Sequence, residues 1–492
     1  MLSPEFRAAL LFLSVIGVGC GQASPTGLRQ LHPCTGDEGP ADALCGSLQV
    51  FENRQAAAGR RLALAIVVLP ATSDDYRADP VMFLAGGPGQ GAARLAPLIQ
   101  AVFGRLQRHR DVVLVDQRGT GRSHPLECKS ADDTLRAEIP DDPSALARLR
   151  ECLESYDADV RQYTTPIAMD DLEDVRAFLG YERVNLYGAS YGTRAALVFL
   201  KQHPSRVRTI TLDGVAPADM RLPLFAARDA SRALEQVLTD CRNEQGCRDA
   251  YPDLRARTIA LLARLERAPA TVHVRHPRTG RHEPVEVTPR VVAGALVAAL
   301  YAPLTASTIP MLLHRAAQDD FAPLLAMALA GDDSDGISVG MQLSVLCSED
   351  VGRVDAAAVE RESASSLFGG HLAAGPLTAC REWPRGALPS GYFDPVASDV
   401  PALILSGDLD PVTPPGWGEH VAQHLTNGRH YVASGTGHGV ASSACGLRVV
   451  EQFLERASAV ALDAACLDES QRPFFFVSPS GPDPLARGSA RK

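Results

Sequence analysis

The sequence predicts an α/β fold in which helices flank a mostly parallel sheet and a large helical cap is inserted after the sixth strand. Three observations predict it. Short, continuously apolar runs recur along the chain, as strands buried on both faces require. These runs end in turns rich in Gly, Pro or Asp, and helical patterns follow them. Between residues 218 and 398, Ala- and Leu-rich runs at helical spacing replace the strands, which predicts the cap.

The first informative turn is Ala85-Gly86-Gly87-Pro88-Gly89, which follows the apolar strand from Pro80 to Leu84. Taken alone, this is an ordinary Gly/Pro turn. Glycine also lets backbone N–H groups approach a developing oxyanion closely. If the chain carries a nucleophile, we expect one oxyanion donor here, from Gly87 or its neighbour Gly86.

A nucleophile is predicted at Ser190, in the run Gly188-Ala189-Ser190-Tyr191-Gly192. This run follows the apolar strand from Val184 to Tyr187 and opens the helix from Thr193 to Leu200. A turn that reverses a strand directly into a helix strains its central residue and leaves room only for glycine beside it. Ser190 would stand exposed at the end of the strand, and the backbone N–H of Tyr191 would be the second oxyanion donor.

The acid is predicted at Asp410, in the loop Gly407 to Pro414 that follows the apolar strand from Val400 to Ser406. Thr413 would orient this loop by hydrogen bonding. Two other acids stay open. Asp408 lies in the same loop, where it would support the turn, and Asp213 closes the strand that begins at Val207, where it would brace the strand end.

The base is predicted at His438, between Gly437 and Gly439 in the loop after the strand from Arg429 to Ala433. The other histidines considered lie in charged or proline-adjacent stretches. A serine hydroxyl needs a base within hydrogen-bond reach, and a buried carboxylate fixes the tautomer of that base. The chain order of serine, aspartate and histidine, each after a parallel strand, therefore predicts a catalytic triad.

The cap contains one uncharged stretch long enough to span a membrane, from Val291 to Leu313. Prolines and hydroxyl side chains within it argue against a membrane span. We interpret it as a buried cap helix broken at Pro303, which helps to line an apolar subsite. The further cap helices expected are Leu234 to Leu238, Ile259 to Leu265 and Met311 to Ala330.

Residues 1–23 read as an export signal, with Arg7 before an apolar run too short to span a bilayer. Cys20 lies in a partial match to a lipoprotein cleavage box, so either lipidation at Cys20 or ordinary cleavage stays open. The predicted divisions are core residues 24–217, cap 218–398, core 399–470 and a tail 471–492.

Eleven cysteines are an odd number, and ten remain when Cys20 is set aside. Proximity along the chain suggests five disulfides, as an oxidising compartment such as a periplasm or the cell exterior permits. The suggested pairs are Cys34 with Cys45, Cys128 with Cys152, Cys241 with Cys247, Cys347 with Cys380, and Cys445 with Cys466.

The net charge of −10 gives no reason to expect a nucleic-acid partner. Paired C-x-x-C spacing is absent from the sequence, and the triad chemistry needs neither a metal nor an organic cofactor. We expect a monomer that contacts a membrane only through a lipid at Cys20.

Five ordered motifs, GGPG, DQRGTGRS (Asp116 to Ser123), GASYG, GDLDPVTP and GTGHG, make the chain resemble the prolyl and tripeptidyl aminopeptidase branch of the α/β-hydrolases. Proline iminopeptidases usually carry a histidine where this chain has Ala85. The segment from Cys347 to Asp350, followed by Cys380 to Pro384, looks like that of secreted tripeptidyl aminopeptidases. The resemblance implies removal of short amino-terminal fragments from peptides.

An enzyme that acts at a free amino terminus must bind an ammonium group, and a carboxylate at the rim of the site would do so. Glu349 is the first candidate and Asp350 the second, although both also fit loop acids paired with arginines. The sequence thus predicts an exported serine exopeptidase acting on peptides with a free amino terminus. An esterase or C–C bond hydrolase with the same triad stays open, as does a silent binding protein on this scaffold.

Overall fold

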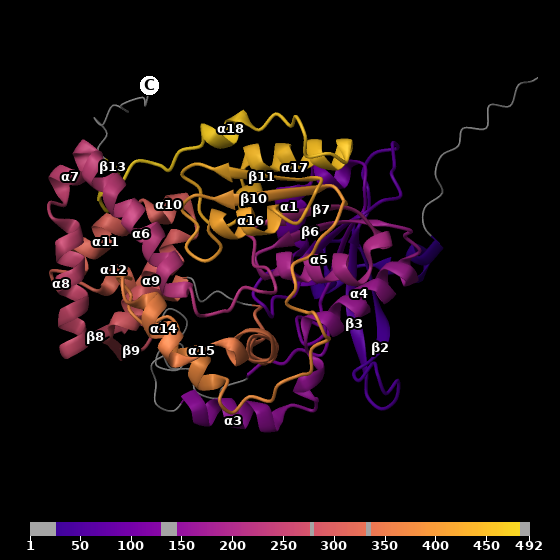
Figure 1. Cartoon of the computed structure of the whole chain (residues 1–492), viewed down its shortest axis with the longest axis horizontal. Coiled ribbons are helices and arrows are strands. Elements are labelled where there is room, and N and C mark those ends of the chain that lie inside the picture. Colours follow the sequence, from indigo (N-terminus) through magenta and orange to yellow (C-terminus); the bar gives the residue numbers. More distant parts are fainter. Residues whose placement is uncertain (1–25, 129–144, 276–279, 331–335, 483–492) are drawn as a thin grey trace, which may run out of the picture.

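The computed structural model describes residues 26–128, 145–275, 280–330 and 336–482. Its main sheet has nine strands in the order β1-β2-β3-β5-β4-β6-β7-β10-β11 (Figure 1). The pairs from β5 to β11 are parallel, whereas β1, β2 and β3 join by antiparallel pairing. The strands are β1 (His32–Pro33), β2 (Leu44–Phe51), β3 (Arg61–Leu69), β4 (Val81–Leu84), β5 (Val112–Val115), β6 (Val184–Ala189), β7 (Val207–Asp213), β10 (Ala402–Gly407) and β11 (Gly428–Ala433).

Helices cover both faces of this sheet, so its central strands are apolar without alternation. Residues of α4 and α5 share a buried cluster with one face, and residues of α1 and α17 share a second cluster with the other. The helices of the core are α1 (Ala96–Phe103), α3 (Ala145–Ser155), α4 (Thr165–Leu179), α5 (Tyr191–Gln202), α16 (Pro415–Ala422), α17 (Ala444–Arg456) and α18 (Ala465–Asp468).

The insertion follows β7, which is the sixth strand of the sheet once the two-residue β1 is set aside. It has its own buried cluster beside the carboxyl ends of the strands (Figure 1). Its helices are α6 (Ala226–Asn243), α7 (Gln245–Ala250), α8 (Leu254–Arg267), α9 (Pro289–Leu300), α10 (Pro303–Ala306), α11 (Ile309–Ala316), α12 (Ala322–Ala330), α13 (Val339–Val345), α14 (Ala356–Ser363) and α15 (Ala374–Ala379). We call this insertion the lid.

The lid differs from the prediction in two respects. The helix expected from Met311 to Ala330 is divided into α11 and α12, with residues 317–321 between them. The lid is also not wholly helical. Strands β8 (Ala270–Arg275) and β9 (His282–Val287) form an antiparallel pair. Their burial alternates along each strand, as period-two patterning requires. The uncharged stretch is divided into α9, α10 and α11, with the first break just before Pro303, since proline disfavours helical backbone in the preceding residue. Among the described residues, no helix is both long and apolar enough to cross a membrane.

Residues 471–482, the first part of the predicted tail, pack on the lid. Phe475 is fully buried in the lid cluster, and its N–H donates to Glu244 Oε1 at 3.0 Å. Strands β12 (Phe476–Ser478) and β13 (Gly481–Pro482) follow. The N–H of Phe476 donates to the carbonyl of Ser307 at 3.1 Å. This segment therefore continues from α18 of the core and packs on the lid.

Phe475→Ala should destabilise the protein by about 3 to 5 kcal/mol, because removing a fully buried aromatic ring leaves a cavity in the lid cluster. Phe474 is the matched control, since 42% of its surface is exposed. Thermal and urea unfolding of both variants would check this. Equal losses of stability in the two variants would mean that Phe475 does not anchor the segment.

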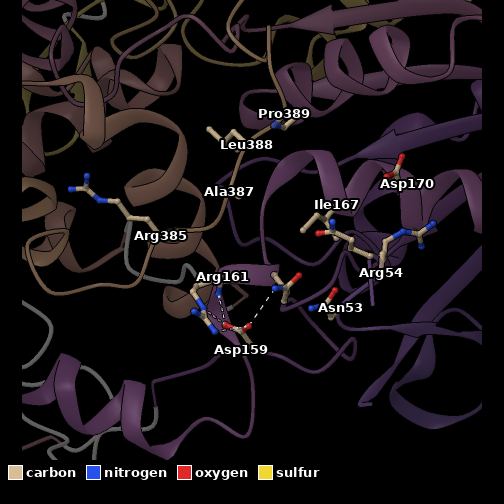
Figure 2. Close-up of a pocket in the computed structure, with 12 residues that line it drawn as sticks. Asn53, Arg54, Asp159, Arg161, Ile167, Asp170, Arg385, Ala387, Leu388 and Pro389 are labelled. Carbon is tan, nitrogen blue, oxygen red and sulfur yellow. Dashed lines mark hydrogen bonds and ion pairs between the residues drawn. The ribbon is translucent and has the colours of Figure 1, made fainter. Parts of the chain in front are cut away.

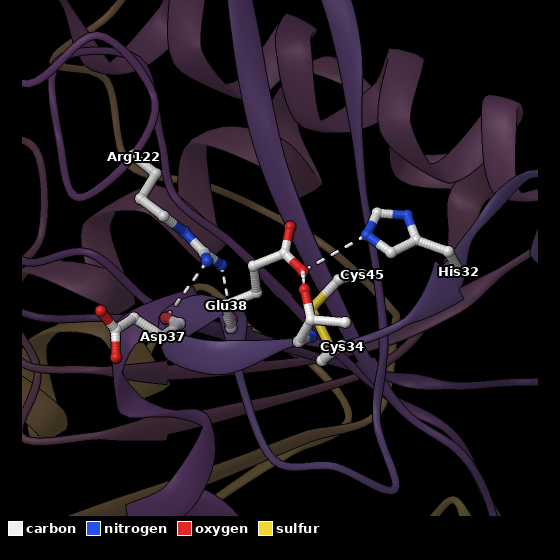
Figure 3. Close-up of a disulfide and its surroundings, with 7 residues drawn as sticks. His32, Cys34, Asp37, Glu38, Cys45 and Arg122 are labelled. Atoms are coloured by element: carbon white, nitrogen blue, oxygen red, sulfur yellow. Dashed lines mark hydrogen bonds and ion pairs between the residues drawn. A yellow bond between two sulfur atoms is a disulfide. The ribbon is translucent and has the colours of Figure 1, made fainter.

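The described residues form five disulfides, which join the same five pairs that proximity along the chain suggests. Figure 3 shows the first, Cys34–Cys45. Beside it, Arg122 of the DQRGTGRS loop donates to the carbonyls of Asp37 and Glu38. The bridge ties the segment around Cys34 to β2, and the hydrogen bonds of Arg122 hold that segment against the loop. Cys20 and the predicted signal lie outside the described residues, and the predicted domain limits stay predictions.

Candidate active site

Ser190 lies in the turn between β6 and α5, with φ 57° and ψ −125°. This conformation is strained for a residue with a Cβ. A Cβ on Gly188 would lie 2.3 Å from the carbonyl oxygen of Gly192, and a Cβ on Gly192 would lie 2.0 Å from that of Leu84. Only glycine fits at these two positions. The Ser190 side chain makes no capping hydrogen bond to α5, so its hydroxyl is not used to hold the helix.

The turn after β4 lies directly against this serine. A Cβ on Gly86 would lie 3.2 Å from the Cβ of Ser190. Gly87 has φ 105°, which favours glycine. Tyr191 is the first residue of α5, where backbone N–H groups have no helical partner. The structure therefore brings the two predicted donor segments to Ser190, and the donor roles of Gly87 and Tyr191 stay predictions.

Asp410 and His438 form a direct pair after β10 and β11. His438 Nδ1 lies 2.8 Å from Asp410 Oδ2, and the Asp410 side chain is fully buried. Thr413 donates to the same carboxylate from its hydroxyl at 2.6 Å and from its N–H at 2.9 Å. Its hydroxyl oxygen also lies 3.1 Å from His438 Nδ1. Thr413 thus contacts both side chains, whereas the sequence predicts for it only an orienting role in the acid loop.

One short segment at the end of β7 connects this pair with the serine. The N–H of Ser190 donates to the carbonyl of Asp213 at 2.9 Å. At the next residue, a Cβ on Gly214 would lie 3.0 Å from Cε1 of His438. Ser190 and the imidazole therefore lie beside the same two residues. The structure brings all three predicted triad residues to one end of the sheet.

The two alternative acids hold the histidine loop in place. Asp213 is buried, and its carboxylate accepts the N–H groups of Val440 and Ala441 at 2.8 and 2.9 Å and the hydroxyl of Tyr187 at 2.9 Å. It braces the loop after His438 rather than its own strand end. Asp408 Oδ1 accepts the N–H of Thr436 at 3.3 Å, so it supports the histidine loop rather than only its own turn.

The pair shifts the pKa of each partner. Burial alone would raise the pKa of Asp410, but the charge and hydrogen bond of His438, followed by Thr413, lower it below the usual range. Burial alone would lower the pKa of His438, but the charge and hydrogen bond of Asp410, followed by the charge of Asp213, raise it above 6.5. Opposite charges close together favour both charged forms, which explains the two directions.

We expect kcat/KM to rise with pH through an apparent pKa above 6.5, because the predicted base His438 must be neutral to accept a proton. Two carboxylates, Asp410 and Asp213, raise the pKa of His438, and Asp213 has the smaller effect. Asp213→Asn removes that effect, so the rising limb of the pH profile should move to lower pH. Initial rates between about pH 5 and pH 9 for the wild type and this variant would test both points. An apparent pKa below 6.5 in the wild-type profile would contradict the conclusion that Asp410 and Asp213 raise the pKa of His438.

Glu349 and Asp350 lie in a π-helical turn (Leu346–Asp350), and both are fully buried. Thr165 donates to Glu349 from its N–H at 2.7 Å and from its hydroxyl at 2.9 Å, and the Tyr392 hydroxyl also donates. Arg194 donates to the two oxygens of Asp350 at 2.7 and 3.0 Å. The sequence predicts both acids at the rim of the active site, whereas the structure buries them completely. The amine-binding role stays a prediction.

Sequence reasoning missed the contacts that join these acids to the serine turn. The hydroxyl of Tyr191 lies 2.7 Å from Thr165 Oγ1, which in turn donates to Glu349. Arg194 is part of the first turn of α5, the helix that follows Ser190. Buried charges need partners, so one signal was available in the sequence: Arg194 stands in a helix whose neighbouring residues are apolar. The network fixes the start of α5, which carries the Tyr191 amide.

A lid residue also holds the acid loop, and no sequence signal pointed to it. Arg232 on α6 donates to the carbonyls of Asp408 and Asp410 at 2.7 and 2.9 Å. Nearby, the indole N–H of Trp417 on α16 donates to Asp229 on α6 at 3.1 Å. The position of the predicted triad acid therefore depends on the lid as well as on the core.

The DQRGTGRS loop has a structural role next to the site. Asp116 accepts the N–H groups of Ala93 and Arg122 at 2.7 and 2.9 Å, which ties this loop to the segment after the GGPG turn. Arg118 is fully buried and donates to both oxygens of Asp171 at 2.6 and 2.8 Å. The motif thus positions the loop that carries the predicted oxyanion donor.

A groove of about 1050 Å³ lies between the β2–β3 connection, the start of α4 and residues 385–389 (Figure 2). None of the predicted catalytic residues lines it. Arg54 binds Asp171 and Asp174, and Arg161 binds Asp159. These charges are partnered within the protein, so we assign the groove no role. Within the described ranges, no cluster of three or more His, Cys, Asp or Glu is arranged to hold a metal ion.

Two family models match the chain. One described as an alpha/beta hydrolase fold matches residues 79–244, which include Ser190, and one described as a TAP-like protein matches residues 365–466, which include Asp410 and His438. The topology and these matches agree on the fold class predicted from the sequence.

Curated relatives match parts of the chain. Serine protease Hip1 of Mycobacterium tuberculosis is 28% identical over 277 residues, which cover 49% of this chain and 52% of that protein. Tripeptidyl aminopeptidase of Streptomyces lividans is 28% identical over 43% of this chain and 42% of its own length. Proline iminopeptidase of Neisseria gonorrhoeae is 32% identical over 28% of this chain and 32% of its own length. The chain thus spans about half, or less, of the relatives that it matches.

Proposed function

Because the chain is an α/β-hydrolase whose second part matches a TAP-like family, we propose that it is a serine peptidase that releases short amino-terminal fragments from peptides. The observation that carries the proposal is the Asp410–His438 pair at 2.8 Å, beside the Asp213–Gly214 segment that also holds Ser190. The names of the relatives, which are peptidases and aminopeptidases, favour a peptide substrate.

In the proposed reaction, Ser190 Oγ attacks the scissile carbonyl carbon and its proton passes to His438. The amides of Tyr191 and Gly87 bind the oxyanion, and His438 then gives the proton to the leaving amine. Water, activated by the same histidine, hydrolyses the acyl-enzyme. Asp410 keeps the imidazole in the required tautomer. The lid restricts access to short peptides or free chain ends.

We further propose that the protein is exported and acts as a monomer. The five disulfides support an oxidising compartment. The charge and apolar pattern of residues 1–23 supports an export signal, with lipidation at Cys20 as one way of anchoring the protein to a bacterial membrane.

The test is hydrolysis of fluorogenic mono-, di- and tripeptidyl amides, each with a free and an acetylated amino terminus. In parallel, a fluorophosphonate probe should label the protein, and mass spectrometry should place the label on Ser190. We expect amide cleavage that acetylation abolishes, and the preferred length would define the fragment released. Labelling of Ser190 with cleavage of simple esters and of no amide would instead establish the esterase reading.

A further inference from the structure

Tyr301 is the lid residue in direct contact with the predicted base. It follows α9, and its carbonyl oxygen accepts the N–H of His438 at 2.8 Å. The two rings meet edge to face, with their centroids 4.9 Å apart at 61°. A Cβ on Gly437 would lie 2.3 Å from the same carbonyl oxygen. The lid therefore packs tightly on the histidine loop at this point, and α10 lies beside the loops after β10 and β11 (Figure 1).

The Tyr301 side chain is accessible to solvent, with an exposed fraction of 41%. The ring therefore lies beside the imidazole and still has a face that a bound substrate can contact.

The stretch of chain that contains Tyr301 is uncharged. The sequence from Val291 to Leu313 has no charged residue. Within it, Leu304 on α10 is 58% exposed and follows Tyr301 by three residues. A charged substrate group placed here would lose hydration without gaining a partner from this stretch, whereas an apolar group would gain from leaving water.

The chemistry of the triad determines which part of a substrate lies beside Tyr301. His438 gives its proton to the leaving amine, so the leaving residue must lie beside the imidazole. We propose that Tyr301 and Leu304 form the subsite for the first residue after the scissile bond, and that they select an apolar side chain there. This inference rests on the proposed function and adds to it the class of residue at which cleavage occurs.

The experiment compares peptides that share a free amino terminus and the best acyl part, and that differ only in the leaving residue, which is Leu, Phe, Gly or Asp. Wild type should cleave the Leu and Phe peptides about 10- to 100-fold more efficiently in kcat/KM than the Gly and Asp peptides. Tyr301→Ala should lose about tenfold more on the Leu and Phe peptides than on the Gly peptide. Tyr301→Phe should keep the wild-type preference.

Two further variants sharpen the result. Leu304→Arg places a cation in the subsite, so the Asp peptide should improve relative to the Leu peptide. Val460→Ala is the matched control, because Val460 is 57% exposed and lies in the loop after α17, so its preference should equal that of wild type.

The outcomes separate this inference from the proposed function. If wild type cleaves peptides but Tyr301→Ala and Leu304→Arg leave the preference unchanged, the subsite is overturned and the peptidase stands. An equal loss by Tyr301→Ala on all four peptides would show that Tyr301 only positions His438, which also overturns the subsite. If wild type cleaves no peptide at all, both proposals fall.

Discussion

Ser190→Ala should lower kcat/KM on peptidyl amides by about 10⁴- to 10⁶-fold, because the remaining groups can bind substrate and polarise its carbonyl but cannot form the acyl-enzyme. The fold should survive the change. The serine side chain makes no capping bond, and alanine meets the same backbone strain at φ 57° as serine does. The measurement is steady-state hydrolysis of the best amide, with far-UV circular dichroism and thermal unfolding of the same preparation.

The matched control for this prediction is Ser442→Ala, which removes an exposed hydroxyl that donates only to the carbonyl of Gly439 in the histidine loop. It should keep nearly all activity. The Ser190 variant should also lose labelling by the fluorophosphonate probe. Retention of amide hydrolysis in a folded Ser190→Ala protein would remove the serine from the mechanism and, with it, the proposed function.

Asp410→Asn should lower kcat by about 10⁴-fold with little effect on KM, because an amide N–H would face His438 Nδ1 and favour the wrong tautomer of the imidazole. Asp410 Oδ2, which accepts from Thr413, lies 2.8 Å from His438 Nδ1. An amide group in place of this oxygen would therefore put a donor against the histidine nitrogen. Pre-steady-state acylation with an activated ester would show whether the loss occurs in the first chemical step.

The two alternative acids supply the comparison. Asp213→Asn replaces an acceptor of two loop N–H groups and one hydroxyl, so it should cost about 1 to 3 kcal/mol of stability while keeping much more activity than Asp410→Asn. Asp408→Asn should act more mildly, since its carboxylate accepts from Thr436 at 3.3 Å. If Asp213→Asn loses as much kcat as Asp410→Asn without loss of stability, Asp213 is the acid.

Much of the core could be predicted because its signals are local. The apolar runs at residues 80–84, 184–187 and 400–406 correspond to β4, β6 and β10 within one to two residues at each end. The spacing of Gly188 and Gly192 around Ser190 predicted a turn that admits no other residue, and the close approaches of 2.3 and 2.0 Å give the reason.

The departures arise where contacts join distant segments. Glu349 and Asp350 looked like surface acids because charged residues in loops usually face water. Their partners Thr165, Arg194 and Tyr392 are far from them in sequence, so the position of Arg194 in an apolar helix could indicate a buried partner for that charge but not which acids supply it. The same holds for Phe475, whose burial depends on a lid that is formed by residues from another part of the chain.

The sequence by itself therefore determined the order of the elements. A serine lies in a strand–turn–helix, an acid and a histidine follow later strands, and the lid is inserted between the serine and the acid. Such features depend on backbone conformation and spacing within about ten residues, which residue type controls directly. Only the tertiary structure decided which lid residues contact the predicted catalytic residues. Arg232 holds the acid loop and Tyr301 packs on His438 because folding brings lid and core surfaces together, and such pairings depend on the shape and burial of both surfaces rather than on either segment alone.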